Sequence, residues 1–274
     1  MSYIYAIKLC ILVFNVDFMS NYLKKIDNPA FFVVGSGPGD PDLLTIRGFN
    51  VLKAAKVILY DNLANKELLN IASDDCEKIY VGKKPYGLCT PQETIHQLIK
   101  YYAFTRGNVV RLKGGDPFIF GRGFEEILFA REHGIESHYV PGISSMQASG
   151  LSDIPLTHRG VSESFWIITG TKKDGSLSAD LQLAIKSKAT VVIYMGMKKL
   201  KEISSAYIMS GKEAVPAAII QNASMPHQKR VVCEVKDLFE AAMNSALTNP
   251  AIIIIGDVVK AAEFIAAQQA HKSA

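Results

Sequence analysis

From residue 31 onward the sequence alternates short apolar runs with longer amphipathic stretches, and this alternation restricts the fold more than any other feature. Five β-branched, apolar runs bounded by turn residues predict buried strands at 31–35, 56–61, 77–82, 108–114 and 136–141. The amphipathic stretches between them predict helices at 42–55, 65–72, 91–103 and 122–133. The third of these begins with a capping-box pattern, Thr90 followed by Glu93. Strands and helices that alternate in this way predict a parallel sheet with helices on its faces.

A Gly-, Ser- and Pro-rich stretch at 141–160 predicts a linker around one short helix. Beyond it, further strands are predicted at 164–170, 190–196, 216–222, 228–235 and 249–259, and helices near 178–187, 198–211 and 236–246. No helical stretch separates residues 216–222 from 228–235, so these two runs predict a hairpin in a mixed sheet. We therefore expect an α/β chain with two α/β domains, at 29–140 and 161–274.

Residues 1–28 precede the first predicted strand, and we expect them to form an N-terminal extension outside the fold. Lys8 and Asp17 interrupt their apolar run, which leaves far fewer than the roughly 20 residues of a membrane span. A secretory signal is the weaker interpretation because no basic segment precedes the run and no A-x-A-like site follows it. We favour translation from Met19, which would place the first 18 residues outside the protein.

The composition argues for an ordinary packed core. Apolar residues make up 49% of the chain and charged residues 20%, which argues against disorder. The formal net charge of +4 is too small to indicate a nucleic-acid binder. The four cysteines form no CxxC pair and the six histidines have no metal spacing, so we expect no metal site and a reducing, cytoplasmic location.

A glycine-rich stretch, VGSGPGDPDLLT, spans residues 34–45 between a predicted strand and a predicted helix. A dinucleotide fingerprint of the G-x-G-x-x-G type would need a glycine at position 40, where Asp40 stands. Pro38 and Pro41 would stiffen a turn that must wrap a pyrophosphate, and Asp40 would repel it. Asp61 imitates the ribose-binding acid of such sites, yet we disfavour a nucleotide-binding oxidoreductase.

The stretch RLKGGDPFIFGRG, residues 111–123, carries the stronger signal. A predicted strand delivers Gly114, Gly115, Asp116 and Pro117 at its carboxyl end, where α/β sheets build their sites. The two glycines remove side chains where another group must come close. The alternative is a tight turn in which Asp116 serves only as a cap.

These motifs occur in order with YDNLA (60–64), YVGKK (80–84), VPGISS (140–145), IPLTHRG (154–160), VIYMGM (192–197) and PAIIIIGDVV (250–259). The chain resembles the tetrapyrrole methylase family over nearly everything except the first 30 residues and the tail. The resemblance implies a fold of two α/β domains with a cleft between them that binds S-adenosylmethionine (SAM). It also implies methylation of uroporphyrinogen III at C2 and C7 to precorrin-2, for sirohaem or cobalamin, in a homodimer. S-adenosylhomocysteine would be the second product.

The resemblance also assigns residues to SAM. The implied contacts are Pro38, Gly114, Gly115, Asp116, Ile119, Ser144, Ser145, Met195 and Ala223. Family members usually carry Thr-Ala at Ser144 and Ser145, and often Gly near Ala223. Small residues stand at these positions in both cases, so we expect SAM binding to survive. Met195 could equally be a core residue at a strand end.

Asp61 and Lys83 both lie just past predicted strands, and the family assigns proton-acceptor and proton-donor roles to these positions. An ion pair between them is the alternative, as is a lysine that only anchors a substrate carboxylate, because a lysine pKa near 10.4 suits an acid poorly.

Uroporphyrinogen III carries eight carboxylates, and a set of basic residues in or beside the motif loops fits such a polyanion. These are Lys84, Arg111, Lys113, Arg122 and Arg159, with Lys83 beside them. Two other functions stay open: another corrin-ring methylase, such as a precorrin-4 methylase, and a non-catalytic tetrapyrrole carrier that would need no SAM.

Overall fold

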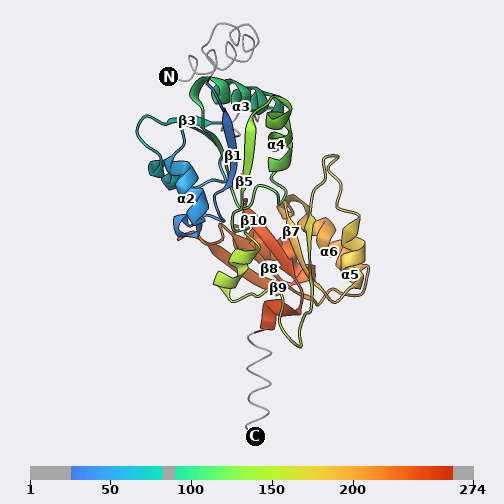
Figure 1. Cartoon of the computed structure of the whole chain (residues 1–274). Coiled ribbons are helices and arrows are strands. Elements are labelled where there is room, and N and C mark those ends of the chain that lie inside the picture. The colour runs from blue at the N-terminus through green and yellow to red at the C-terminus, as the bar shows by residue number, and fades with distance from the viewer. Residues whose placement is uncertain (1–25, 83–89, 262–274) are drawn as a thin grey trace. The chain divides into compact units, whose positions relative to one another are not determined.

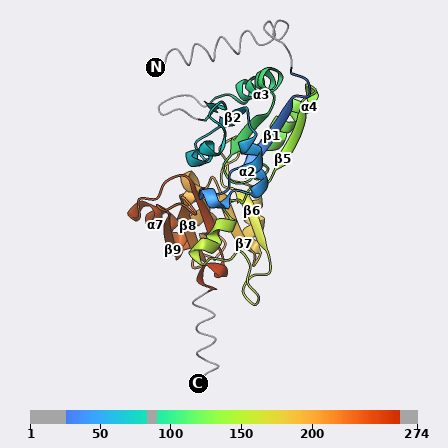
Figure 2. The same cartoon turned by 60° about the vertical axis from the view of Figure 1, so that its left-hand side comes forward.

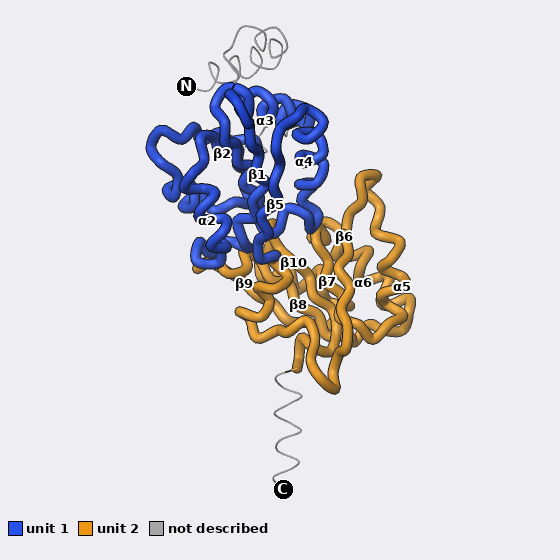
Figure 3. The backbone as a smooth tube through the Cα atoms, viewed as in Figure 1, with its two compact units in different colours: residues 1–144 blue, residues 145–274 orange. Residues whose placement is uncertain are grey.

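The computed structural model describes residues 26–82 and 90–261. The chain forms two compact units, Met1–Ser144 and Ser145–Ala274, which Figure 3 shows in blue and orange. The first unit ends inside the stretch that the sequence predicts as a linker.

The first unit is built on a five-stranded parallel sheet. Its strands are β1 (Ala30–Gly35), β2 (Val57–Tyr60), β3 (Glu77–Tyr80), β4 (Val109–Lys113) and β5 (Glu136–Val140). Their order across the sheet is β3-β2-β4-β1-β5, and all four pairings are parallel. Figures 1 and 2 show β1 and β5 side by side. The predicted parallel α/β sheet is confirmed.

Helices cover both faces of this sheet. Side chains along a strand point alternately to its two sides, so neighbouring strand residues pack in different cores. Val33 and Leu59 pack in one core with residues of α3 (Gln92–Arg106) and α4 (Gly123–Glu132). Val34 and Ile58 pack in another core, with residues of α2 (Ile46–Lys53) and of the 3-10 helix η2 (Lys66–Ile71).

The start of α3 differs from the prediction. Pro91 is the N-cap and makes no side-chain capping bond, so Thr90 is not the cap of a capping box. The backbone of Pro91 is extended (ψ 146°), and the helix begins one residue later than expected. The hydroxyl of Thr90 instead donates to the carbonyl of Gly82 at 3.5 Å.

The helix predicted over residues 42–55 is divided. Pro41–Leu43 form a 3-10 helix (η1), and α2 follows only at Ile46. The division comes at Thr45, whose extended backbone (φ −68°, ψ 149°) and side chain cap α2 by accepting from the amide of Gly48.

The second unit contains a mixed sheet with the order β6-β7-β10-β8-β9. Its strands are β6 (Phe165–Thr169), β7 (Thr190–Tyr194), β8 (Pro216–Gln221), β9 (Lys229–Glu234) and β10 (Ala251–Ile255). Only β6 and β7 pair in parallel, while β8 and β9 form the predicted antiparallel hairpin. The α-helices of this unit are α5 (Asp180–Lys186), α6 (Leu200–Ile208) and α7 (Leu238–Asn244).

Up to residue 261, where the described part of the second unit ends, it also contains four 3-10 helices. They are η3 (Gln147–Ser152), η4 (Met197–Lys199), η5 (Val235–Asp237) and η6 (Asp257–Lys260). Ile193, Ile219 and Ile253 are fully buried in a core that they share with residues of α5, α6 and α7. A second, smaller core packs against the other side of β8 and β10 and includes Ala148 and Ile154.

Candidate functional site

The carboxyl ends of all five strands of the first sheet meet at one edge, because the strands run in the same direction. The loop after β1 carries Pro38, Asp61 follows β2, the loop after β4 carries Gly114 to Ile119, and the loop after β5 leads to Ser144. We call residues 36–40, 61–63, 114–119 and 141–144 the strand-end loops. They contain every SAM contact that the sequence predicts in the first unit.

Glycines allow these loops to touch backbone to backbone. A Cβ on Gly35 would lie 2.6 Å from the carbonyl oxygen of Gly115 and 2.6 Å from the Cα of Gly142. The amide of Gly115 donates to the carbonyl of Gly37 at 2.8 Å, and its φ of +67° favours glycine. The glycines therefore hold the loops after β1, β4 and β5 against one another.

The two consecutive glycines that follow β4 have different surroundings. A Cβ on Gly114 would clash with the side chain of Leu63 and would lie 2.9 Å from its carbonyl oxygen. What comes close to Gly114 is thus the loop after β2. At Gly115, by contrast, the nearest atoms to a Cβ would be the Cα and Oγ of Ser144, at 3.8 and 3.9 Å. Apart from the neighbours of Gly115 in the chain, no other heavy atom of the described residues would lie within 4 Å of this Cβ.

Asp116 ties the loop after β4 to the end of β5. Its Oδ1 accepts from the amide of Phe118 at 2.8 Å. Its Oδ2 accepts from the hydroxyl of Tyr139 at 2.5 Å and from the amide of Gly142 at 3.1 Å. Burial raises the pKa of Tyr139, as do the hydrogen bond and charge of Asp116, so the hydroxyl stays a donor. Asp116 is itself buried and acts as an anchor between two strand-end loops.

Asp61 forms an ion pair with Arg111. Its Oδ2 accepts from Nη2 of Arg111 at 2.7 Å, and its Oδ1 accepts from the amide of Leu63 at 3.0 Å. Burial alone would raise the pKa of Asp61, but the charge and hydrogen bond of Arg111, with the Leu63 amide and the charge of Lys113, lower it overall. Asp61 is therefore ionised at neutral pH.

Two more charged side chains, Glu126 and Lys113, are buried beside this ion pair. Oε1 of Glu126, on α4, lies 3.5 Å from Nε of Arg111 and 3.4 Å from Nζ of Lys113. The side-chain Nε2 of Gln92, on α3, donates to the same Oε1 at 3.1 Å. Burial lowers the pKa of Lys113 and the charge of Arg111 adds to this, against the opposing effect of Glu126 and Asp61. Arg111, Lys113, Asp61 and Glu126 form what we call the buried charge cluster.

The other predicted substrate cations lie in different surroundings. Arg122 has a left-handed backbone (φ 58°) at the start of α4, and its guanidinium pairs with Glu125 through Nε at 2.9 Å and Nη2 at 2.6 Å. Arg159 is exposed, in the second unit. Lys83 and Lys84 fall outside the described residues. The structure thus brings Asp61, Arg111 and Lys113 together, and Arg122 is engaged separately.

Three predicted SAM contacts belong to the second unit. Met195 follows β7 with a left-handed backbone (φ 56°), and its side chain is half exposed, unlike a core methionine. Ala223 follows β8 between Asn222 (φ 51°) and Ser224 (φ 72°), and it is buried. β7 and β8 are both antiparallel to β10, so these two residues lie at the same edge of the sheet. Ser145 begins the unit and is half-buried.

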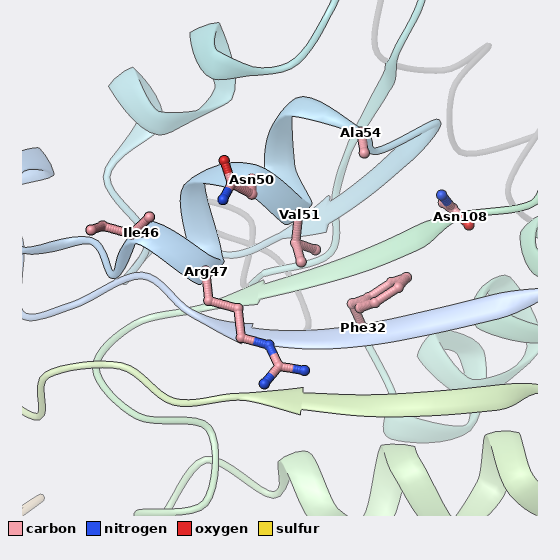
Figure 4. A pocket seen from close by; sticks show the side chains of 7 residues that line it. All are labelled: Phe32, Ile46, Arg47, Asn50, Val51, Ala54 and Asn108. Atoms are coloured by element: carbon pink, nitrogen blue, oxygen red, sulfur yellow. The ribbon is translucent and has the colours of Figure 1, made fainter.

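A surface pocket of about 360 Å³ lies elsewhere on the first unit, between α2 and the sheet (Figure 4). Phe32, Val51 and Ala54 give it a mainly apolar lining, with Arg47 and Asn108 at its sides. None of the predicted site residues lines it.

Sequence reasoning missed Glu126 and Tyr139. A signal for Glu126 was present, because it falls on the buried stripe of α4 with Gly123, Ile127 and Ala130. A carboxylate on such a stripe needs a buried cation nearby. Tyr139 carried no comparable signal, since a tyrosine is common in a strand.

Within the described ranges, no group of three or more His, Cys, Asp or Glu side chains is arranged to hold a metal ion. No helix in those ranges combines the length and apolar character that crossing a bilayer requires.

Comparison with known proteins identifies the family. Residues 30–238 match the family model of the Tetrapyrrole (Corrin/Porphyrin) Methylases. The uroporphyrinogen-III C-methyltransferase of Bacillus subtilis is 42% identical over 231 residues, which are 83% of this chain and 90% of that protein. The siroheme synthase of Chromobacterium violaceum is 42% identical over 236 residues, and the chain spans only 50% of its length.

A solved structure agrees with these relatives. It is the uroporphyrin-III C-methyl transferase of Thermus thermophilus complexed with S-adenyl homocysteine. The TM-score is 0.73 at 38% identity, over 85% of this chain and 99% of that one. The glycine-built loops after β1, β4 and β5 lie inside the range that the family model matches. The resemblance seen in the motifs is therefore confirmed, and the chain belongs to the tetrapyrrole methylase family.

Proposed function

We propose that this chain is a SAM-dependent methyltransferase that methylates uroporphyrinogen III at C2 and C7 and so forms precorrin-2. The observation that carries the proposal is the set of strand-end loops, joined by Gly35, Gly115 and Gly142. These loops lie in the part of the chain that matches the family model. The Bacillus subtilis relative, 90% of whose length matches this chain, is named for this activity. The product would serve sirohaem or cobalamin synthesis.

SAM would bind at the strand-end loops of the first unit. The room that the described residues leave beside Gly115 supports this, since a side chain there would fill a place that a ligand can take. Asp116 would act through the backbone it holds, because both of its carboxylate oxygens already accept hydrogen bonds. Pro38, Ile119 and Ser144 belong to the same loops. Ser145, Met195 and Ala223 stay predicted contacts, each to be tested by its own variant.

The reaction needs alignment more than acid–base help. SAM, when bound, would supply an electrophilic methyl group to a pyrrole β-carbon of the substrate, with the methyl–sulfur bond breaking to leave S-adenosylhomocysteine. Holding two reactants in line can contribute roughly 7–11 kcal/mol to such a bimolecular step. Loops joined by close backbone contacts suit this task because each fixes the position of the next.

Asp61 would act on the charge that the reaction generates. The methylated ring is cationic and loses a proton to regain conjugation. An ionised carboxylate can accept this proton or stabilise the cation. The lowered pKa of Asp61 favours an anion at neutral pH and makes it a weak base, which suffices for an acidic, positively charged ring. Lys83, outside the described residues, stays the predicted partner in proton transfer.

The substrate's carboxylates would contact exposed cations. Arg122 and Arg159 are exposed and suit this role. Lys84, outside the described residues, stays a candidate. Arg111 and Lys113 suit it poorly because both are buried and paired with carboxylates.

Incubation with uroporphyrinogen III and SAM tests the proposal. Mass analysis is expected to find two added methyl groups, and calorimetry is expected to detect binding of S-adenosylhomocysteine. Asp61→Asn is the matched variant: it should keep the affinity for S-adenosylhomocysteine and lose roughly 10²–10⁴-fold in turnover. A protein that binds the tetrapyrrole but not S-adenosylhomocysteine would instead be a carrier.

We further propose a homodimer in the cytoplasm. Exposed apolar side chains on and before α4, namely Phe118, Phe120, Phe124 and Leu128, support an interface. The described cysteines, Cys76 and Cys233, are free thiols, which fits a reducing compartment. Light scattering at assay concentration would detect a particle of twice the 30.0 kDa chain mass, and a particle of one chain mass would contradict the dimer.

A further inference from the structure

Arg111 stands where a charged side chain is costly. It lies in the middle of β4, a strand buried along its whole length, and its side chain is 4% exposed. Burying a charge away from water is unfavourable unless other groups compensate it. A buried ion pair is also a poor source of stability compared with apolar packing of the same volume. The presence of Arg111 therefore calls for an explanation beyond folding.

The guanidinium of Arg111 is directed by contacts within the first unit. Nη1 donates to the carbonyls of Leu112 at 2.8 Å and Leu59 at 3.3 Å. Nη2 donates to Asp61 at 2.7 Å, and Nε faces Glu126. A substrate carboxylate would have to displace one of these contacts and enter a buried place. The geometry is that of a fixed support for Asp61.

Glu126 makes this arrangement possible. It is fully buried and faces Arg111 and Lys113, so the cluster contains two cations and two carboxylates. Its Oε2 is buried without a hydrogen-bond partner among the described residues, so its contacts with the two cations run through Oε1. Without Glu126, two buried cations would share Asp61 alone.

We propose that Arg111 is a positioning residue that keeps the Asp61 carboxylate ionised and oriented at the strand-end loops, with Glu126 as the counter-charge that holds Arg111 in place. The importance of this for turnover rests on the proposed role of Asp61. Arg111 then contributes to the rate through Asp61, and the affinity for substrate does not depend on it.

Among the groups around the cluster, Arg111 has the largest effect in favour of the ionised form of Asp61. Lys113 acts on Asp61 from the same strand with a charge that burial weakens. The Tyr80 hydroxyl, on β3, donates to the neighbouring Asn62. Burial lowers the pKa of His96, on α3, so this ring is neutral beside Glu126 at neutral pH. Among the described residues, the ion pairs of the cluster involve no acid or base other than its four members.

The test follows the titration of the Asp61 carboxyl carbon by NMR in the full chain, for the wild type and for Arg111→Gln. We expect the titration of Asp61 to move to higher pH in the variant, because burial then acts without the guanidinium. Arg111→Lys should return it part of the way. Arg106→Gln is the matched control: it removes an exposed arginine paired with Glu77 at 3.5 Å and should leave Asp61 unchanged.

The double variant Arg111→Gln, Glu126→Gln is the control in case the single variant does not fold. It removes one buried charge of each sign. It should show the same displacement of the Asp61 titration. An unchanged Asp61 titration in this folded variant, or in Arg111→Gln, would overturn the proposal.

Kinetics separate this inference from the proposed function. If Asp61 takes the proton, the acid limb of the kcat–pH profile of Arg111→Gln should move to the same pH as the NMR titration of Asp61. Below that pH, kcat should fall about tenfold per pH unit, and the substrate KM should be unchanged. A displaced NMR titration with an unaltered acid limb would refute the role of Asp61 and leave its support by Arg111 intact. A raised KM with both titrations unaltered would assign Arg111 to the substrate and overturn the inference.

Discussion

Replacing Asp116 by alanine should loosen two strand-end loops at once. The carboxylate accepts from Phe118, Tyr139 and Gly142, and hydrogen bonds to a charged group contribute about 1.5–3 kcal/mol each. Phe118 is the most exposed of the three donor residues, so we assign its bond the smallest loss, about 1 kcal/mol. The other two donors are partly buried and lose about 1.5–3 kcal/mol each. The expected total is about 4–7 kcal/mol.

A loss of this size lies within the 5–15 kcal/mol that folded proteins typically have. We therefore expect Asp116→Ala to stay folded at low temperature, with a Tm lower by roughly 10–25 °C. Tyr139→Phe is the matched control because it removes only one of the three donors. It should cost about 1–2 kcal/mol, and its Tm should fall by roughly 3–8 °C.

Calorimetry with S-adenosylhomocysteine, at a temperature where circular dichroism reports a folded protein, measures the effect on binding. Asp116→Ala should weaken binding by at least about tenfold, since the loops that would hold the ligand lose their common anchor. Unchanged Tm and unchanged affinity together would refute the anchoring role. Lost affinity at wild-type stability would instead indicate that Asp116 contacts the ligand itself.

Three further outcomes are expected. Gly35→Ala should lower the unfolding free energy by about 3 kcal/mol in urea titrations, because its Cβ would lie 2.6 Å from the Cα of Gly142, whereas Gly150→Ala, with open space around it, should change it little. Asp61→Asn should lower the unfolding free energy at neutral pH. This loss should shrink as the pH falls below 3.8 and through the lowered pKa of Asp61, because the wild-type carboxyl then becomes protonated. A loss that grew on acidification would contradict the ion pair. Deletion of residues 1–18 should leave Tm and turnover unchanged, since the family match begins at residue 30, and an inactive but folded truncation would refute this.

The sequence by itself determined the α/β class, the hairpin of β8 and β9, and the family. These properties depend on local patterns: strands and helices have different apolar periods, and glycine motifs stand at fixed distances from strand ends. The position of Asp61 at the carboxyl edge of the sheet also followed from the sequence, because parallel strands must end together. Local signals were less reliable at helix ends, where Pro91 rather than Thr90 proved to be the cap of α3.

Only the tertiary structure decided what the charged residues near that edge contact. The sequence predicted Arg111 and Lys113 as cations near the substrate, and only the structure shows that Glu126 of α4 contacts both of them inside a buried cluster. Asp116 stays a predicted ligand contact, and the structure adds that it accepts a hydrogen bond from Tyr139 of β5. The period of a strand tells which face a side chain takes, but the partner on that face comes from an element distant in the chain. Whether a charge is exposed to substrate or neutralised inside the protein is therefore a property of packing.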